Sequence, residues 1–142
     1  MNEEIKIQKI KETLEIGQVA LETLKQAQIK LESVKSWITI DGFGGSFLIS
    51  IVKHTKIDET LHFLEQAKKD VRRFQLQLKT IELPMSVKKD VGIFVSFATF
   101  FLDGTVENYL IKERVNTAFE AYKNIDAIIR VIYRRINKTN LL

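Results

Sequence analysis

The sequence predicts an all-α protein: an elongated, antiparallel helical bundle of three long helices and one shorter apolar helix, with coiled-coil-like packing. Apolar residues recur at alternating spacings of three and four over long stretches of the 142-residue chain, which places them along one face of a helix. The chain also has only one Pro and six Gly, so residues that favour turns are few. Because 45% of the residues are hydrophobic and 28% are charged, as in a folded protein, we expect a single domain over residues 1–142.

The first helix is expected over residues 2–36, with Asn2 as a possible N-cap. Gly17 lies in the middle of this helix, where glycine costs about 1 kcal/mol relative to alanine. It indicates either a close crossing with another helix or a tolerated glycine. The expected buried face is formed by Ile10, Leu14, Gly17, Leu21, Leu24, Gln28 and Leu31.

The second helix is expected over residues 46–82. It should end before Pro84, because proline disfavours the helical conformation in the residue before it. Its buried face is expected to be formed by Ile57, Leu61, Leu64, Ala67, Val71, Phe74, Leu78 and Ile81.

After Pro84 the chain changes to the nearly continuous apolar run VGIFVSFATFFL. Twelve residues are too few to cross a bilayer as a helix. We expect a short buried helix over residues 93–102 rather than a buried strand, because no other segment reads as a strand. Residues 85–92 are either extended or helical, and an extended segment brings the chain back along the bundle.

The last helix is expected over residues 105–138 and has the most regular pattern in the chain. Steps of four and three continue without a break, which is typical of a long helix packed in a bundle. The residues concerned are Ile111, Val115, Ala118, Tyr122, Ile125, Ile129, Ile132 and Ile136.

Antiparallel packing of these segments brings the two Asp-Gly turns, Asp41-Gly42 and Asp103-Gly104, to one end of the bundle. An aromatic base is expected at that end. Its members would be Trp37, Phe43, Phe47, Phe94, Phe97, Phe100, Phe101 and Tyr109.

The glycine-containing loop after the first helix is a candidate small-ligand site. Its residues would be Asp41, Gly44, Gly45, Lys53 and His54, because backbone amides at a helix N-terminus bind anions. The loop lacks the spacing of a phosphate-binding loop. Glycines that enable a tight turn between two helices are therefore the simpler interpretation.

A divalent-metal site is a second possibility at the same end. His54 and Asp58 are four residues apart and share a helix face, and Asp103 and Glu107 would add carboxylate oxygens if the two turns converge. The alternative is that Asp41 and Asp103 are cap or turn residues and that His54 and Asp58 form a simple side-chain pair.

The formal net charge is +4, and the end of the chain is its most basic part, with Arg130, Arg134, Arg135 and Lys138. Basic residues near a helix C-terminus complement the helix dipole, and a nucleic-acid binder usually gathers such residues on one face. We prefer a solvated helix end to phosphate contacts. A nucleic-acid partner is therefore not expected.

The chain contains no Cys, which suits a reducing cytoplasm and excludes a disulfide framework and thiolate metal sites. Its N-terminus lacks the apolar core of a signal peptide. We expect a cytoplasmic protein with no cofactor and no transmembrane segment. Peripheral membrane contact through the aromatic end is less expected than burial of those aromatic residues.

A pattern in the middle of the chain consists of Trp37, Asp41, Gly44, Gly45, Lys53, His54, Lys56 and Asp58, followed by FFLDG at 100–104. In these residues the chain resembles members of an uncharacterised family of small, soluble bacterial helical proteins. The resemblance covers most of the chain from Trp37 to about Val115. It implies a helical bacterial cytoplasmic protein and implies no activity.

These patterns favour a non-enzymatic helical interaction or scaffold protein that self-associates, as a homodimer, or binds another helical protein. The alternative is a small-ligand or divalent-metal-binding protein with its site between the two Asp-Gly turns. No catalytic residue is assigned. His54 and His62 are the only histidines, and no Ser is placed with either in a recognisable nucleophile motif.

Overall fold

The computed structural model describes residues 3–41, 47–103 and 115–140, and their side chains over residues 3–34, 58–98 and 119–138. Four helices account for almost all of these residues, and no strand occurs among them. They are α1 (Glu3–Asp41), α2 (Phe47–Leu78), α3 (Met85–Asp103) and α5 (Val115–Asn140). The prediction of an all-α helical bundle is confirmed.

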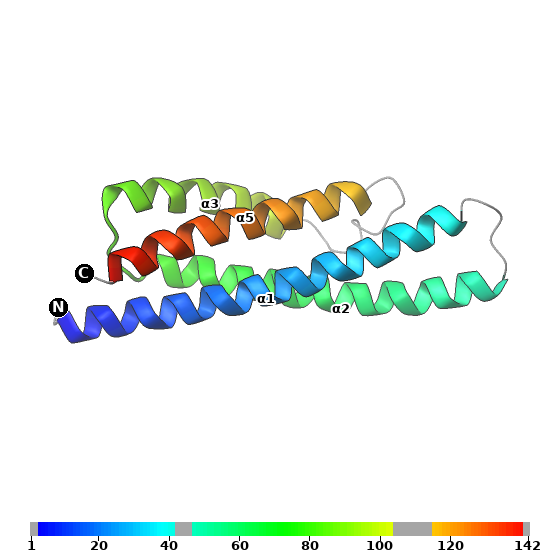
Figure 1. Cartoon of the computed structure of the whole chain (residues 1–142), viewed down its shortest axis with the longest axis horizontal. Helices are drawn as coiled ribbons and strands as arrows, with labels where there is room; N and C mark the ends of the chain where they lie inside the picture. The colour runs from blue at the N-terminus through cyan, green and yellow to red at the C-terminus, as the bar shows by residue number, and fades with distance from the viewer. Residues whose placement is uncertain (1–2, 42–46, 104–114, 141–142) are drawn as a thin grey trace.

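The four helices form a ring in which each helix packs against two neighbours. Helix α1 contacts α2 and α5, and α3 contacts the same two helices. Neighbouring helices run in opposite directions, so α1 and α3 are parallel to each other on one diagonal of the ring (Figure 1). The start of α1, the turn between α2 and α3, and the end of α5 all lie at the same end of the bundle.

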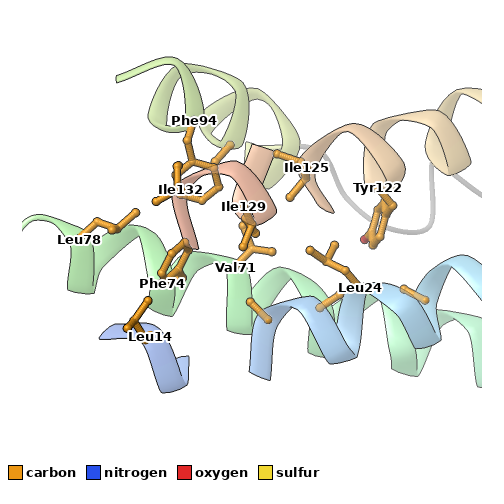
Figure 2. Close-up of a cluster of buried hydrophobic side chains, with 14 of the residues drawn as sticks. Leu14, Leu24, Val71, Phe74, Leu78, Phe94, Tyr122, Ile125, Ile129 and Ile132 are labelled. Carbon is orange, nitrogen blue, oxygen red and sulfur yellow. The ribbon is translucent and has the colours of Figure 1, made fainter. Parts of the chain in front are cut away.

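The core follows the seams predicted from the sequence. In α5, Tyr122, Ile125, Ile129, Ile132 and Ile136 are all fully buried. The first four of these side chains point into the ring, towards those of α1 and α2 (Figure 2). Each fully buried side chain of this size stabilises the fold by about 1.5–3 kcal/mol. The buried hydrophobic residues contributed by the other three helices are Leu14, Ala20, Leu24, Ala27, Leu31, Val34, Leu64, Ala67, Val71, Phe74, Leu78, Val87, Phe94 and Ala98.

Helices α1 and α2 lie close together at Gly17. A Cβ added to Gly17 would lie 2.8 Å from Cε1 of Phe74, and the Phe74 ring packs on its other side against Phe94 of α3, with the ring centroids 5.7 Å apart. Both aromatic rings are fully buried. Of the two interpretations of Gly17, the structure therefore supports a close helix crossing.

The turn between α2 and α3 begins earlier than predicted, because α2 ends at Leu78 and not near residue 82. The carbonyl of Gln77 accepts hydrogen bonds from the backbone N–H of Thr80 (3.0 Å) and from its Oγ1 (2.7 Å). The carbonyl of Pro84 then accepts bonds from the N–H groups of Val87 and Lys88, both at 3.0 Å. Helix α3 therefore starts directly after the proline.

Residues 85–92 are helical, which is one of the two conformations left open for them, and the start of the third helix at residue 93 is therefore wrong. The reason is a seam that crosses the expected boundary: Val87, Phe94 and Ala98 are buried, and Val91 packs against the core. Their spacings of four, three and four residues place them on one helix face. The prediction of an aromatic base is also wrong for Phe94, which packs on Phe74 within the core.

A polar contact crosses the ring between the diagonal helices α5 and α2. The hydroxyl of the fully buried Tyr122 donates a hydrogen bond of 3.2 Å to the carbonyl of Leu64. A buried hydroxyl needs such a partner, because leaving it unpaired costs about 1–3 kcal/mol. Tyr122 therefore links α5 to α2 at the level of Leu64.

Candidate functional site

The predicted small-ligand residues lie around the α1–α2 connection. Asp41 is the last residue of α1, and Lys53 and His54 lie in the first part of α2. The side chains of these three residues, and Gly44 and Gly45 altogether, are outside the described part of the structure. The small-ligand site therefore stays a prediction.

The predicted metal ligands come from two helices. Asp58 lies one turn after His54 in α2 with an exposed side chain, Asp103 is the last residue of α3, and Glu107 is outside the described residues. Among the side chains that are described, no group of three or more His, Asp or Glu residues is placed to hold a metal ion. The metal site also stays a prediction.

The ends of α1 and α3 lie at different levels of the bundle. Both helices start at the same end, where Lys6 of α1 pairs with Glu82 in the α2–α3 turn at 3.8 Å. With 39 residues α1 is about 58 Å long, whereas α3 with 19 residues is about 28 Å long. Helix α1 consequently continues well past the end of α3 (Figure 1), and Asp41 lies further along the axis than Asp103.

The outer face of α3 is the first surface feature that the structure reveals. Met85 is 71% exposed and Ile93 is 61% exposed, although both are large apolar residues. No charged residue occurs between Asp90 and Asp103 in the sequence, so α3 carries more than three turns without a charge, although Gly92, Ile93 and Ser96 are exposed. Such a helix is normally buried on all sides.

A shallow hollow lies on this outer face, lined by Lys89, Gly92, Ile93, Ser96 and Phe97. A Cβ added at Gly92 would meet nothing within 4 Å. The glycine is therefore not required for packing within the chain, in contrast to Gly17. It leaves room on the surface for a side chain from outside.

The four basic residues near the end of the chain do not act as one cluster. Nε of Arg135 lies 2.9 Å from Oδ2 of Asp90 and joins α5 to α3, and only Lys138 lies in the last turn of α5. Arg130 and Arg134 line a groove on the opposite side of α5, against α1. The helix-end interpretation therefore fits Lys138 and not the three arginines.

The α1–α5 groove has a volume of about 500 Å³. Helix α1 supplies one wall and α5 supplies the other. The lining residues are Gln18, Leu21, Glu22, Lys25, Arg130, Tyr133 and Arg134.

A hydrogen-bonded network behind the groove orients Arg130. Its Nε donates a bond of 2.6 Å to Oδ1 of Asp126, and Nε2 of Gln28 in α1 donates to Oδ2 of the same carboxylate at 3.3 Å. Asp126 is only 9% exposed. In addition, Nε of Arg134 donates to the carbonyl of Arg130 at 3.3 Å.

Sequence reasoning missed this groove. The four-residue spacing of Asp126 and Arg130 is a signal of a pair within one helix, and it could have separated Arg130 from the other basic residues. Nothing in the sequence shows that Lys25 lies opposite, because the register of α1 against α5 depends on packing of the whole ring. Gln28 and Asp126 are 98 residues apart.

Fold and surface together define an all-α four-helix bundle with an uncharged segment from Val91 to Ala98 on α3 and a groove between α1 and α5 that is lined by three basic residues and one acidic residue. No helix in the described parts of the chain has the length and apolar character needed to cross a membrane. Comparisons with family models, with curated proteins and with solved structures find no match for this chain. The bacterial origin and cytoplasmic location implied by the resemblance therefore stay predictions.

Proposed function

We propose that the protein is a non-enzymatic helical interaction protein that self-associates through the outer face of α3. The observation that carries the proposal is the exposure of Ile93 in the part of α3 that has no charged residue between Asp90 and Asp103. Met85, before Lys88 and Lys89 in the same helix, is exposed as well. Removing apolar surface from water contributes about 25 cal/mol per Å². A second α3 packed on this face would supply that burial.

A second copy of the same chain fits the face because the face is self-complementary in chemistry. In a two-fold symmetric dimer the same patch is used by both copies, so a charged patch would repel itself unless opposite charges alternated on it. The segment from Val91 to Ala98 carries no charge to be repelled or left unpaired. Lys89 lies at the edge of the hollow, where a long side chain can reach water.

The hollow at Gly92 gives the two helices a way to interlock. A side chain such as Ile93 of a second copy would fill the space above Gly92 and between Lys89 and Ser96, as a knob fills a hole in a coiled coil. Gly and Ser four residues apart also allow two helix backbones to approach closely, as small residues do in other helix pairs.

Analytical ultracentrifugation over a wide range of protein concentration tests the proposal. The unmodified chain is expected to change from monomer to dimer as its concentration rises, and Ile93→Lys is expected to stay monomeric where the unmodified chain is dimeric. Leu76→Lys is the matched control, because Leu76 is 53% exposed on α2 and outside the α3 face. It should leave the association constant unchanged.

Two results would contradict self-association through α3. One is a strict monomer at the highest concentration reached. The other is a dimer that Ile93→Lys leaves intact while circular dichroism shows that the variant is folded, because the interface would then lie elsewhere. A strict monomer that is recovered from cells with a helical partner, and loses that partner in Ile93→Lys, would assign the face to a different protein.

A further inference from the structure

We propose that the α1–α5 groove is a second binding site, separate from the α3 face, and that it takes a phosphate monoester whose organic part is apolar or carries a ring. Arg130 and Arg134 of α5 and Lys25 of α1 would hold the phosphate. Leu21 and Tyr133 would contact the organic part.

Charge within the groove favours an anion. Three of the seven lining residues are basic and one, Glu22, is acidic. Asp126 offsets part of the charge of Arg130, but it is buried behind the groove and is not among the lining residues. The open side of the groove is therefore positive.

Both arginines are held in place by the protein and still have donors to offer. The Nε of Arg130 is used by Asp126, and the Nε of Arg134 is used by the carbonyl of Arg130. Within the described residues, neither the terminal guanidinium nitrogens of these two arginines nor the ammonium group of Lys25 have a hydrogen-bond partner. Side chains fixed before binding lose less conformational entropy when a ligand arrives.

The number and kind of these donors match a phosphate group. A phosphate monoester has three strong acceptor oxygens and a charge of about −1.5 to −2 at neutral pH. Two guanidinium edges and one ammonium group supply charge-assisted hydrogen bonds for all three oxygens, and guanidinium groups bind phosphate in bidentate fashion.

The size and floor of the groove favour a small ligand over a long polyanion. Its α1 wall extends from Gln18 to Lys25, about 10 Å along the helix, and its volume of about 500 Å³ is typical of a small-molecule pocket. Leu21 and Tyr133 are partly buried and pack against the core, so they offer a firm apolar surface beside the cations.

The position of the arginines argues against a role as helix-end charges. The favourable effect of a helix dipole on a cation is confined to the last turn. Helix α5 continues to Asn140 and has only Lys138 as a basic residue in its last turn, so Arg130 and Arg134 both lie before that turn.

Titration with phenyl phosphate, followed by chemical shifts of the backbone amides, tests the site. Saturable shifts are expected in α1 between Gln18 and Lys25 and in α5 near Arg134. Arg134→Gln should raise the Kd about tenfold, because it removes charge-assisted bonds. Lys138→Gln is the control: it removes the same charge from α5 but lies outside the groove, and should change the Kd less than about twofold.

Two further variants change residues of α1, which forms the other wall of the groove. Lys25→Gln should weaken binding in the same direction as Arg134→Gln, and it keeps the test valid if one arginine variant does not fold. Glu22→Gln should tighten binding a few-fold, since it removes the one carboxylate that faces the anion. Inorganic phosphate should bind about tenfold more weakly than phenyl phosphate, because it has no ring to bury against Leu21 and Tyr133.

A phosphate monoester occurs both in soluble phosphate esters and in the headgroup of phosphatidic acid. Two experiments, the titration and a vesicle flotation assay, distinguish these sources. Saturable binding of phenyl phosphate without flotation on vesicles that contain phosphatidic acid indicates a soluble ligand. Flotation that Arg134→Gln abolishes and Lys138→Gln preserves indicates the lipid headgroup. The proposal is overturned if neither probe binds, or if Lys138→Gln weakens binding as much as Arg134→Gln does.

Discussion

Gly17 and Phe74 are in such close contact that a single added carbon on Gly17 would lie 2.8 Å from the Phe74 ring. The ring cannot move away freely, because it is fully buried and Phe94 packs on its other side. The distance between α1 and α2 is therefore set at this point by the absence of a side chain. Stability measurements on both residues can verify this relationship.

Gly17→Ala is expected to destabilise the fold by up to about 2 kcal/mol. The added methyl group overpacks a closed part of the core, which costs about 1–3 kcal/mol, and the better helix propensity of alanine offsets about 1 kcal/mol at most. Urea denaturation followed by circular dichroism measures the change. A variant as stable as the unmodified chain would show that α1 and α2 can separate there without cost.

Combining Phe74→Leu with Gly17→Ala tests whether contact with the Phe74 ring causes the loss of stability in Gly17→Ala. On its own, Phe74→Leu should destabilise the core because it removes buried apolar volume. Combined with Gly17→Ala it should cost less than the sum of the two single changes, since the smaller side chain makes room for the methyl group. Strict additivity would mean that the two residues are not in energetic contact.

Gly92→Ala is expected to have the opposite sign and to stabilise the monomer by about 0.5–1 kcal/mol. Nothing lies within 4 Å of a Cβ at this position, so the substitution brings only the gain in helix propensity. Thermal unfolding at a protein concentration where the chain is monomeric measures the effect. A loss of stability would indicate that Gly92 is already covered within the chain.

Tyr122→Phe should destabilise the fold by about 1 kcal/mol, because it removes the buried hydroxyl that donates to the carbonyl of Leu64. Tyr133→Phe is the matched control. The Tyr133 side chain is only partly buried, and its hydroxyl has no partner among the described residues, so its loss should change the free energy of unfolding by less than about 0.5 kcal/mol. Equal effects of the two changes would contradict a structural role for the Tyr122 hydrogen bond.

Arg135→Gln should destabilise the fold by about 1–3 kcal/mol, because it takes the counter-charge from the buried Oδ2 of Asp90. Arg135 and Asp90 form an ion pair at 2.9 Å, and Oδ2 of Asp90 accepts no hydrogen bond from the described residues. Without the arginine, this oxygen would therefore be left with no favourable polar contact among them. Adding Asp90→Asn to Arg135→Gln should recover part of the lost stability, since it removes the charge of the carboxylate that has no counter-charge in Arg135→Gln.

The Lys6–Glu82 ion pair is the control for the predicted effect of Arg135→Gln on stability. Its atoms are 3.8 Å apart and the Glu82 side chain is 89% exposed, so Lys6→Gln should change stability by less than about 0.5 kcal/mol. Denaturation of the three variants under identical salt conditions measures both effects. A larger loss from Lys6→Gln than from Arg135→Gln would contradict the ranking by burial.

Sequence periodicity predicted the helices well where one apolar face was continuous. The steps of three and four residues that end at Ile136 placed every described member of that seam in the core. It failed in the first half of α3, where Lys88 and Lys89 interrupt the apolar pattern and conceal the spacing from Val87 to Phe94. In that segment the buried face is narrow, and only contact with α2 and α5 shows which residues belong to it.

The two surface features could be predicted only in part. The uncharged run after Asp90 is visible in the sequence, but a run of this kind is normally buried, and the structure was needed to show that Ile93 is exposed. The groove depends on Lys25 and Arg130 lying at the same level, more than 100 positions apart in the chain. The register of α1 against α5 is set by the packing of all four helices, and no local sequence pattern encodes it.

The directions of α1 and α5 in the ring also determine how the molecule would respond to a mechanical load. The two helices are antiparallel neighbours, and Glu3 and Asn140 lie at the same end of the bundle (Figure 1). A force that pulls these two residues apart would break the α1–α5 contacts one after another, starting from that end. It would not shear all of the contacts at the same time. The Gln28–Asp126 contact lies about halfway along α5, so it would hold until the part of the interface nearer the pulled end had opened.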